Sequence, residues 1–435
     1  MTTMRVLLIS WEYPPMIYGG LGRHVHGLAE ALAAQGHDVV VLTQTHPRAA
    51  PDARVNGVRV VRVAPDPPAR DLATDLVAWV LGLNTALART GRAVVGGWRP
   101  DLVHVHDWVV AHAGVDLAET SGVPLVATIH ATEAGLWDGW LSTPVSRARH
   151  DVEAWLVTRA ARTIVCSAAM QVEVGTALEV PLGELTLIPN GVDLSAWRST
   201  PATAAAARAA LGITPAAPMI VLAGRLEWEK GGDIAIDALP RIRRRHPGTV
   251  LVLAGVGSRR EALAALARRR RVARSVRFCG HLDERGLADL LGAADVAVVP
   301  SSYEPFGMVA LEASAAGTPV VAGATGGLRE LVTDEVSGLL VAPRSVTELG
   351  TAVVRLLDDP EWARTLADAA RAEVAKRFTW PIVAGDTVSA YTAAVADPRP
   401  PRPRPVPVTE GNVLDSRPAS VRARWRDVRG GSGGR

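Results

Sequence analysis

The sequence predicts an α/β protein made of two doubly wound, Rossmann-like domains. Short apolar runs alternate with amphipathic helical patterns along almost the whole chain, which is typical of parallel α/β structure. The alternation stops near Trp197 and starts again at Met219. The chain has 435 residues, too many for one ordinary hydrophobic core. We therefore expect two domains of similar size, with a deep ligand cleft where the carboxyl ends of their strands face each other.

The strands are expected at apolar runs that end in polar or turn-forming residues. In the first half these runs are 5–10, 38–43, 58–63, 102–106, 125–130, 163–167 and 185–189, and in the second half 219–223, 250–254, 276–279, 296–300 and 319–322. Between the first two strands, Leu21, Val25, Leu28 and Leu32 recur at helical spacing and predict an amphipathic helix.

These patterns place an N-terminal domain at 1–195, a linker at 196–217 and a second domain at 218–378. The linker is Ala-rich and flanked by proline, a composition suited to a connecting segment that contains a short helix. One more helix is expected at 379–396. The remaining segment, 397–435, holds seven prolines and ends in Gly-Gly-Ser-Gly-Gly-Arg, so we expect a disordered Pro/Arg-rich tail.

The charge and cysteine content exclude several classes of protein. The pI of about 9.2 is typical of a nucleic-acid binder. However, the segment 397–435 carries nine Arg and four acidic residues, a net charge of +5, and the whole chain carries +3, which leaves −2 on residues 1–396. Two distant cysteines allow neither a disulfide framework nor a zinc site. With no apolar run of about 18–20 residues, we expect a cytoplasmic protein with no nucleic-acid partner and no stable membrane insertion.

In the first half, candidate site residues follow the ends of predicted strands. A glycine-rich segment at 19–22 precedes a helix, where backbone amides could approach an anion, although a plain tight turn explains it equally well. His104 and His106 alternate within one strand, but no third metal ligand has a recognisable spacing, so we predict no metal site. Asp107 and His130 each end a strand and should reach the cleft.

In the second half, two loops point to a phosphate-bearing ligand. Arg225 and Lys230 lie in a loop between a strand and a helix, where a bidentate cation, a point cation and the helix dipole suit a diphosphate. The spacing of Glu304 and Glu312 raises the possibility of a carboxylate pair like that of a glycosidase. Eight helical residues rise about 12 Å, however, and retaining hydrolases hold their carboxylates only about 5–5.5 Å apart. The two carboxylates should therefore have different roles. The backbone amides at the start of the following helix should be free donors, and they belong to Phe306, Gly307 and Met308.

With these motifs the chain resembles the family 4 retaining glycosyltransferases, which have the two-domain GT-B fold. The opening Ser10-Trp11-Glu12-Tyr13-Pro14-Pro15, the glycine segment, His106-Asp107-Trp108 and the segment 130–135 are most similar to actinobacterial glycogen-synthase-like α-1,4-glucosyltransferases. The likeness covers roughly residues 4–396. It implies that the helix at 379–396 crosses back onto the first domain.

The resemblance also implies roles for the donor-side residues. Arg225 and Lys230 would bind the diphosphate of a nucleotide-sugar donor, and Glu312 its ribose hydroxyls. Glu304 and the amides at 306–308 would hold the transferred sugar, and Gly20 would approach the phosphate from the first domain.

On the acceptor side, His130 would contact the transferred sugar near its reacting carbon, and Asp107 would face the acceptor. Retaining enzymes of this fold lack a well-placed protein nucleophile, and the leaving diphosphate itself would take the proton of the acceptor hydroxyl. The residues expected to take part in catalysis are then His130, Arg225, Lys230 and Glu304. Neither a metal nor another cofactor would be required.

The acceptor is expected to be an α-1,4-glucan, extended with glucose from UDP- or ADP-glucose. Nine Trp and Tyr residues fall in the first 155, and aromatic faces stack on sugars. Trp137 lies on a loop expected to overhang the cleft, whereas Trp79 and Trp155, on helical stripes, are expected in the core.

Other readings stay open at this stage. The same motifs serve mannosyl- or N-acetylglucosaminyltransferases that act on inositol or lipid acceptors. A sugar-nucleotide epimerase or a non-catalytic carbohydrate-binding module fits the donor residues less well. The sequence does not decide whether the chain forms a homo-oligomer.

Overall fold

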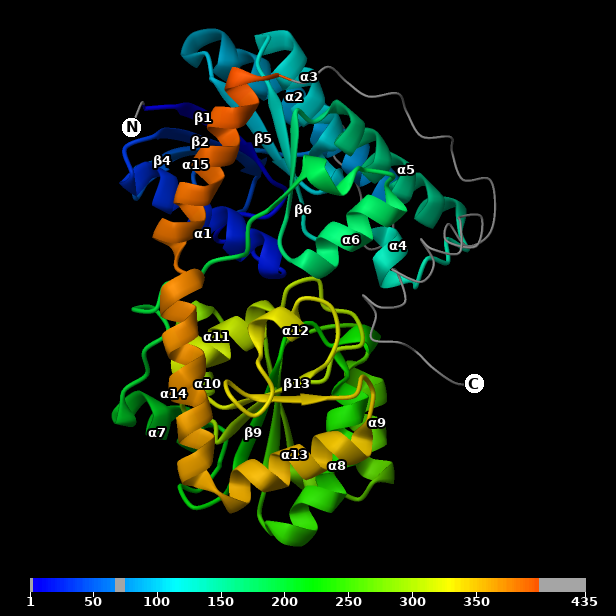
Figure 1. Ribbon diagram of the computed structural model, residues 1–435, viewed down its shortest axis with the longest axis vertical. Coiled ribbons are helices and arrows are strands. Elements are labelled where there is room, and N and C mark those ends of the chain that lie inside the picture. Colours follow the sequence, from blue (N-terminus) through cyan, green and yellow to red (C-terminus); the bar gives the residue numbers. More distant parts are fainter. Residues whose placement is uncertain (1–2, 67–74, 399–435) are drawn as a thin grey trace. The chain divides into compact units, whose positions relative to one another are not determined.

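The computed structural model describes residues 3–66 and 75–398, which form two compact units (Figure 1). The first unit holds the chain up to Gly191 together with the C-terminal helix α15 (Trp380–Ala396). The second unit spans Val192–Thr379. The predicted tail lies outside the described residues from position 399 onwards.

The sheet of the first unit has eight strands in the order β3-β4-β2-β1-β5-β6-β7-β8. All neighbouring strands pair in parallel except β3 and β4, which are antiparallel at the edge. The chain places β2 on one side of β1 and β5 on the other, which makes the carboxyl ends of β1 and β5 a topological switch point. The strands are β1 (Arg5–Ile9), β2 (Asp38–Gln44), β3 (Asp52–Val55), β4 (Val58–Val63), β5 (Leu102–His106), β6 (Leu125–Ile129), β7 (Arg162–Val165) and β8 (Leu185–Leu187).

Helices cover both faces of this sheet (Figure 1). They are α1 (Gly20–Ala34), α2 (Leu76–Trp98), α3 (Ala111–Ser121), α4 (Glu133–Leu136), α5 (Pro144–Arg159), α6 (Ala168–Ala177) and α15. The predicted stripe on α1 is confirmed, because Val25, Leu28 and Leu32 are buried.

Helix α15 packs along α1 although more than 340 residues separate the two helices in the sequence. Close packing of Trp380 depends on two glycines. A β-carbon at Gly27 would lie 2.0 Å from Cε2 of the Trp380 ring, and one at Gly191 would lie 2.5 Å from Cε3. Burial of Val383 and Tyr391 in the core of the first unit fixes the remainder of the helix.

The second unit contains a fully parallel six-stranded sheet in the order β11-β10-β9-β12-β13-β14. Its switch point lies at the carboxyl ends of β9 and β12, since β10 and β12 flank β9 on opposite sides. The strands are β9 (Met219–Ala223), β10 (Val250–Ala254), β11 (Val276–Gly280), β12 (Val296–Val299), β13 (Val320–Gly323) and β14 (Leu339–Val341).

The segment predicted as a linker, 196–217, is part of this second unit. It contains helix α7 (Pro201–Ala210), which packs against α10. Thr200 and Thr203 form a capping box at the start of α7, and Arg208 makes an ion pair with Asp295 at 2.7 Å. The short helix predicted in this Ala-rich segment is therefore confirmed as α7, and it packs within the second unit. The other helices are α8 (Gly232–Arg245), α9 (Arg260–Arg269), α10 (Glu284–Gly292), α11 (Met308–Ala316), α12 (Leu328–Leu331), α13 (Val346–Asp358) and α14 (Pro360–Arg377).

Across residues 3–66 and 75–398, no helix combines the length and the apolar character that crossing a bilayer demands.

Candidate active site

In the first unit, the site residues predicted from sequence gather at the ends of β5 and β6. His104 and His106 lie within β5 and are fully buried. As expected, His104 is a packed strand residue: its Nδ1 is 2.7 Å from the Tyr391 hydroxyl, and its Nε2 is 2.7 Å from the Thr128 hydroxyl. His106 differs, because its Nδ1 lies 3.1 Å from Nε2 of His130, just beyond β6.

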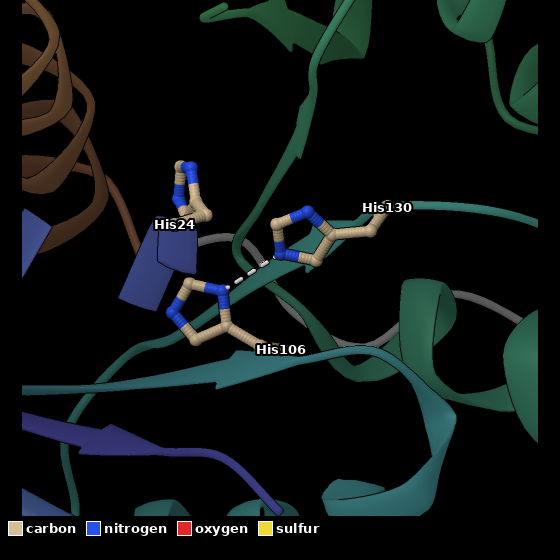
Figure 2. A group of neighbouring side chains, drawn as sticks. All are labelled: His24, His106 and His130. Carbon is tan, nitrogen blue, oxygen red and sulfur yellow. Dashed lines mark hydrogen bonds between the residues drawn. The ribbon is translucent and has the colours of Figure 1, made fainter. Parts of the chain in front are cut away.

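His24, on α1, completes a group of three imidazoles with His106 and His130 (Figure 2). One nitrogen from each ring lies within 4.8 Å of the other two. Burial lowers the pKa of His24 to about 4 and holds the pKa of His106 and His130 well below the ordinary value for imidazole. All three side chains are therefore neutral at pH 7.

Asp107 lies between β5 and a 3₁₀ turn at Trp108–Val110 and holds the neighbouring loop in place. Its Oδ1 accepts a hydrogen bond of 2.7 Å from the backbone amide of His130. Its own amide donates to the Thr128 carbonyl at 3.0 Å. The backbone at Asp107 has φ 60° and ψ 176°, a region almost restricted to glycine. Such strain persists only where surrounding contacts enforce it.

Burial raises the pKa of Asp107 to about 7, although hydrogen bonds from the amides of His130 and Ala131 act in the opposite direction. The carboxyl group is therefore half protonated near neutral pH. A carboxyl group in this state can accept or donate a hydrogen bond.

The loop after His130 leads into α4, whose start is held by buried carboxylates. Thr132 caps α4 through its side chain, and the Thr132 hydroxyl donates to Glu173 at 2.7 Å. Both carboxylate oxygens of Glu153 accept from the Glu133 amide, at 2.9 and 3.1 Å. Trp137, at the end of α4, is 45% exposed and donates from Nε1 to Glu133 at 3.0 Å.

The glycine-rich segment begins α1 at Gly20. Part of the anion-binding capacity expected there is already occupied by a side chain of the same unit. Oε2 of the buried Glu12 accepts from the amides of Tyr18 and Gly19, at 2.8 and 3.0 Å. Glu12 therefore shapes the turn before Gly20, a role that sequence inspection missed.

In the second unit, the two loops at the switch point bring the predicted donor residues together. Lys230 follows β9 through the 3₁₀ turn Trp228–Lys230, and its Nζ lies 2.8 Å from Oε2 of Glu304, which follows β12. The Ser301 hydroxyl donates to the same Glu304 oxygen at 3.0 Å. Arg225 donates to Glu229 at 2.9 Å, with the guanidinium side chain 53% exposed and Glu229 buried.

Both candidate phosphate-binding cations thus carry an acidic partner. The Arg225 guanidinium stays half exposed and retains further donors for a ligand. Lys230 has three donors, of which Glu304 uses one at this geometry.

Helix α11 separates the two candidate carboxylates as expected. Glu304 precedes Pro305 and lies outside the helix, whereas Glu312 lies inside it and is 1% exposed. Gly307, at φ 111°, turns the chain into α11, and Phe306 is buried. The first amides of the helix, from Met308 onwards, have no acceptor within the helix itself.

Two glycines, Gly326 and Gly327, pack closely against the backbone of the loop at 304–306. Gly326, at φ 49°, would place a β-carbon 2.0 Å from the Glu304 carbonyl oxygen, and the Gly327 amide donates to that oxygen at 3.0 Å. A β-carbon at Gly327 would lie 2.6 Å from Cα of Phe306. Side chains at these two positions would therefore push the loop out of place.

Comparison with known proteins identifies the family. The pattern of the family described as Glycosyltransferase Family 4 matches residues 18–196, and that described as Glycosyl transferases group 1 matches residues 204–373. The chain is also 48% identical to a glycogen synthase from Mycobacterium tuberculosis, over 95% of this chain and 100% of the relative. The chain belongs to the family 4 glycosyltransferases. The predicted two-domain GT-B fold is thereby confirmed.

One further relative and one solved structure are also similar to this glycosyltransferase. A D-inositol 3-phosphate glycosyltransferase from Jonesia denitrificans is 34% identical, over 86% of this chain and 91% of the relative. The solved structure of sucrose-phosphate synthase from Thermosynechococcus elongatus is 28% identical, with a TM-score of 0.78 over 90% of this chain and 99% of that chain. Both the catalytic class and the α/β architecture predicted from sequence are consistent with these relatives.

Replacing Gly327 with alanine should raise the KM of this glycosyltransferase for its donor about tenfold, because small displacements of binding groups are costly. Gly327 has φ −67°, so alanine fits the backbone, and only the clash with the 304–306 loop remains. Steady-state kinetics against donor concentration measures the effect. The control is Gly385→Ala on α15, where a β-carbon meets nothing within 4 Å. An unchanged donor KM in Gly327→Ala would show that this glycine does not hold the loop.

Proposed function

We propose that this enzyme transfers glucose from UDP- or ADP-glucose to the end of a linear α-1,4-glucan, with retention of the anomeric configuration. The observation that carries the proposal is 48% identity to a glycogen synthase over that relative's whole length. The motifs of the first unit, which the resemblance relates to the glucan-synthesising branch, agree with it.

On the donor side, Arg225 and Lys230 would bind the diphosphate, with Glu304 and the start of α11 around the transferred sugar. These groups follow the two strands at the switch point of the second unit, where doubly wound sheets bind ligands. Two cations with helix amides offer the charge stabilisation that a departing diphosphate needs. We therefore propose that transfer requires no metal.

On the acceptor side, exposed aromatic rings suit a glucan. Trp137 is 45% exposed, Trp140 is 53% exposed and Tyr18 is 56% exposed, whereas Trp79 is buried. The Trp137 ring is fixed through its Nε1 to Glu133, so it offers a preorganised face for the apolar side of a glucose unit. Asp107 and His130 lie in the same unit, at the ends of β5 and β6.

A second candidate is transfer to an inositol phosphate or an inositol lipid. It is favoured by 34% identity to a protein named D-inositol 3-phosphate glycosyltransferase. The lower identity makes it the weaker candidate. The donor-side residues proposed above would serve either acceptor.

The deciding experiment offers maltooligosaccharides, inositol 3-phosphate and phosphatidylinositol separately, each with labelled UDP-glucose, ADP-glucose or a mannose donor. We expect label only in maltooligosaccharides, from a glucose donor, and at an undiminished rate with a chelator present. Label in inositol phosphate or lipid alone would reject the glucan assignment and leave the glycosyltransferase family standing. Loss of transfer with the chelator would reject metal-independent transfer.

A further inference from the structure

The three imidazoles at the ends of β5 and β6 contain more buried nitrogen atoms than hydrogen bonds to satisfy them. Nδ1 of His24 and Nε2 of His106 are both buried without a regular hydrogen bond among the described residues. The Asn190 side chain interacts with His24 and opposes part of the lowering of its pKa. Nε2 of His106 lies across its ring from Nδ1, the nitrogen that faces His130. His24 is 3% exposed and His106 is fully buried. An unsatisfied buried polar atom costs about 1–3 kcal/mol. An ion held between the three rings would satisfy the nitrogens that face it, which include Nδ1 of His106 but not its Nε2.

The adjacent histidine does not share this feature. The centroid of the His104 ring lies 4.2 Å from that of His106, with the two rings tilted, yet both nitrogens of His104 have hydroxyl partners. Other buried histidines, such as His37, also have a nitrogen without a hydrogen bond among the described residues, so the three rings are distinguished by their convergence (Figure 2) and not by unsatisfied nitrogens alone.

The spacing of the three rings is close to that of a three-histidine metal centre. Zinc binds imidazole nitrogen at about 2.0–2.1 Å, so two ligands of a tetrahedral site lie about 3.3 Å apart. Nδ1 of His106 and Nε2 of His130 are 3.1 Å apart, and the third nitrogen lies within 4.8 Å. A small side-chain rotation that brings the His24 nitrogen to the same spacing of about 3.3 Å would close the site.

We propose that His24, His106 and His130 form a binding site for one transition-metal ion of the Zn²⁺ class, and that occupancy of this site inhibits transfer. Coordination would replace the His106–His130 hydrogen bond with two metal–nitrogen bonds, each ring keeping its proton on the nitrogen away from the metal. His130 is the most exposed of the three, which leaves a fourth position for water.

The inhibitory part rests on the proposed function, in which His130 contacts the transferred sugar. A metal-bound imidazole has no lone pair left at the coordinating nitrogen and is held toward His24 and His106. Metal and sugar should therefore compete for His130, and this metal would be an inhibitor while the transfer itself needs none.

Binding is tested on the full chain, without reference to activity. Calorimetric titration with Zn²⁺ should give one site per chain, and Cu²⁺ electron paramagnetic resonance should show coupling to three imidazole nitrogens. His24→Gln should weaken Zn²⁺ binding by at least about tenfold, as loss of a ligand does. The matched control is His104→Gln, at a buried histidine two residues before His106 on the same strand, whose nitrogens already have partners. This variant should bind Zn²⁺ with an affinity within a few-fold of the parent.

Two results would overturn the site. One is wild-type protein that binds no Zn²⁺, or binds it equally well after His24→Gln in a protein whose circular dichroism shows a native fold. The other is a copper spectrum with fewer than three nitrogens, which needs no variant and so covers the case in which His24→Gln does not fold. Equal binding loss in His281→Gln, at an exposed histidine, would assign the metal to the surface.

Inhibition is tested with maltooligosaccharide acceptors. We expect Zn²⁺ to lower turnover, excess donor to relieve the effect, and a chelator to restore the full rate. Stimulation by Zn²⁺ would reject both inhibition and metal-independent transfer. If the chain does not use maltooligosaccharides, the proposed function fails while the calorimetric and spectroscopic tests of the site still stand.

Discussion

Replacing either Arg225 or Lys230 with alanine should lower turnover by a factor on the order of 10²–10³, the usual loss when one preorganised charge-stabilising donor is removed. Both residues lie in the loop between β9 and α8, outside the core of the second unit. Folding should therefore survive. Lys230→Ala also leaves the Glu304 carboxylate, 12% exposed, without its ion-pair partner, so we expect the larger loss in this variant.

Matched controls exist for both substitutions. Arg285 pairs with Asp289 four residues later and is 53% exposed, as is Arg225 beside Glu229. Lys376, on α14, is the only other lysine in the chain. Arg285→Ala and Lys376→Ala should keep parental turnover, since surface pairs contribute little. Near-parental turnover in Arg225→Ala or Lys230→Ala would remove that residue from the diphosphate site.

The buried parallel strands could be predicted from sequence because their signal is local. Runs of apolar residues such as those of β4, β5, β9 and β10 match the predicted bounds in full. Two strands were missed. The edge strand β3 carries charged residues and only Val55 and Ala53 as apolar ones, and β14 has three residues. An edge strand is half solvated, so the charged residues of β3 leave no clear apolar run. β14 is no shorter than β8, which was predicted, so its length does not explain why it was missed.

Some residues of the candidate site could likewise be predicted from sequence, and others could not. Lys230 and Glu304 were predicted because each follows a strand in its own loop, and the parallel topology then brings strand ends together. The contribution of His24 could not be predicted, since it lies on α1, 82 residues before His106, and only the packing of α1 on the sheet brings their rings within 5.5 Å. The roles of Glu12 and Gly327 depend on local backbone geometry, which residue identity alone does not reveal.

Asp107→Asn should make the stability of the first unit less dependent on pH. Burial raises the pKa of Asp107 from 3.8 to about 7, so between these values the folded state binds a proton that the unfolded state has released. The free energy of unfolding of the parent therefore falls as pH rises through this window. Asparagine cannot ionise, yet its Oδ1 can still accept from the His130 amide. Relative to the parent, the variant should gain about 2–3 kcal/mol between pH 5 and pH 8.

Urea unfolding of both proteins at pH 5 and pH 8, followed by tryptophan fluorescence, measures this difference. Asp101→Asn serves as the control, because Asp101 is half exposed and pairs with Arg5 at the surface, where ion pairs contribute little. Relative to the parent, Asp101→Asn should change the pH dependence of the free energy of unfolding far less than Asp107→Asn does. Parallel pH profiles for the parent and Asp107→Asn would mean that the Asp107 carboxyl group ionises as readily in the folded protein as in water. The strained loop between β5 and α3 would then have to be stabilised by the hydrogen bonds to the amides of His130 and Ala131 alone.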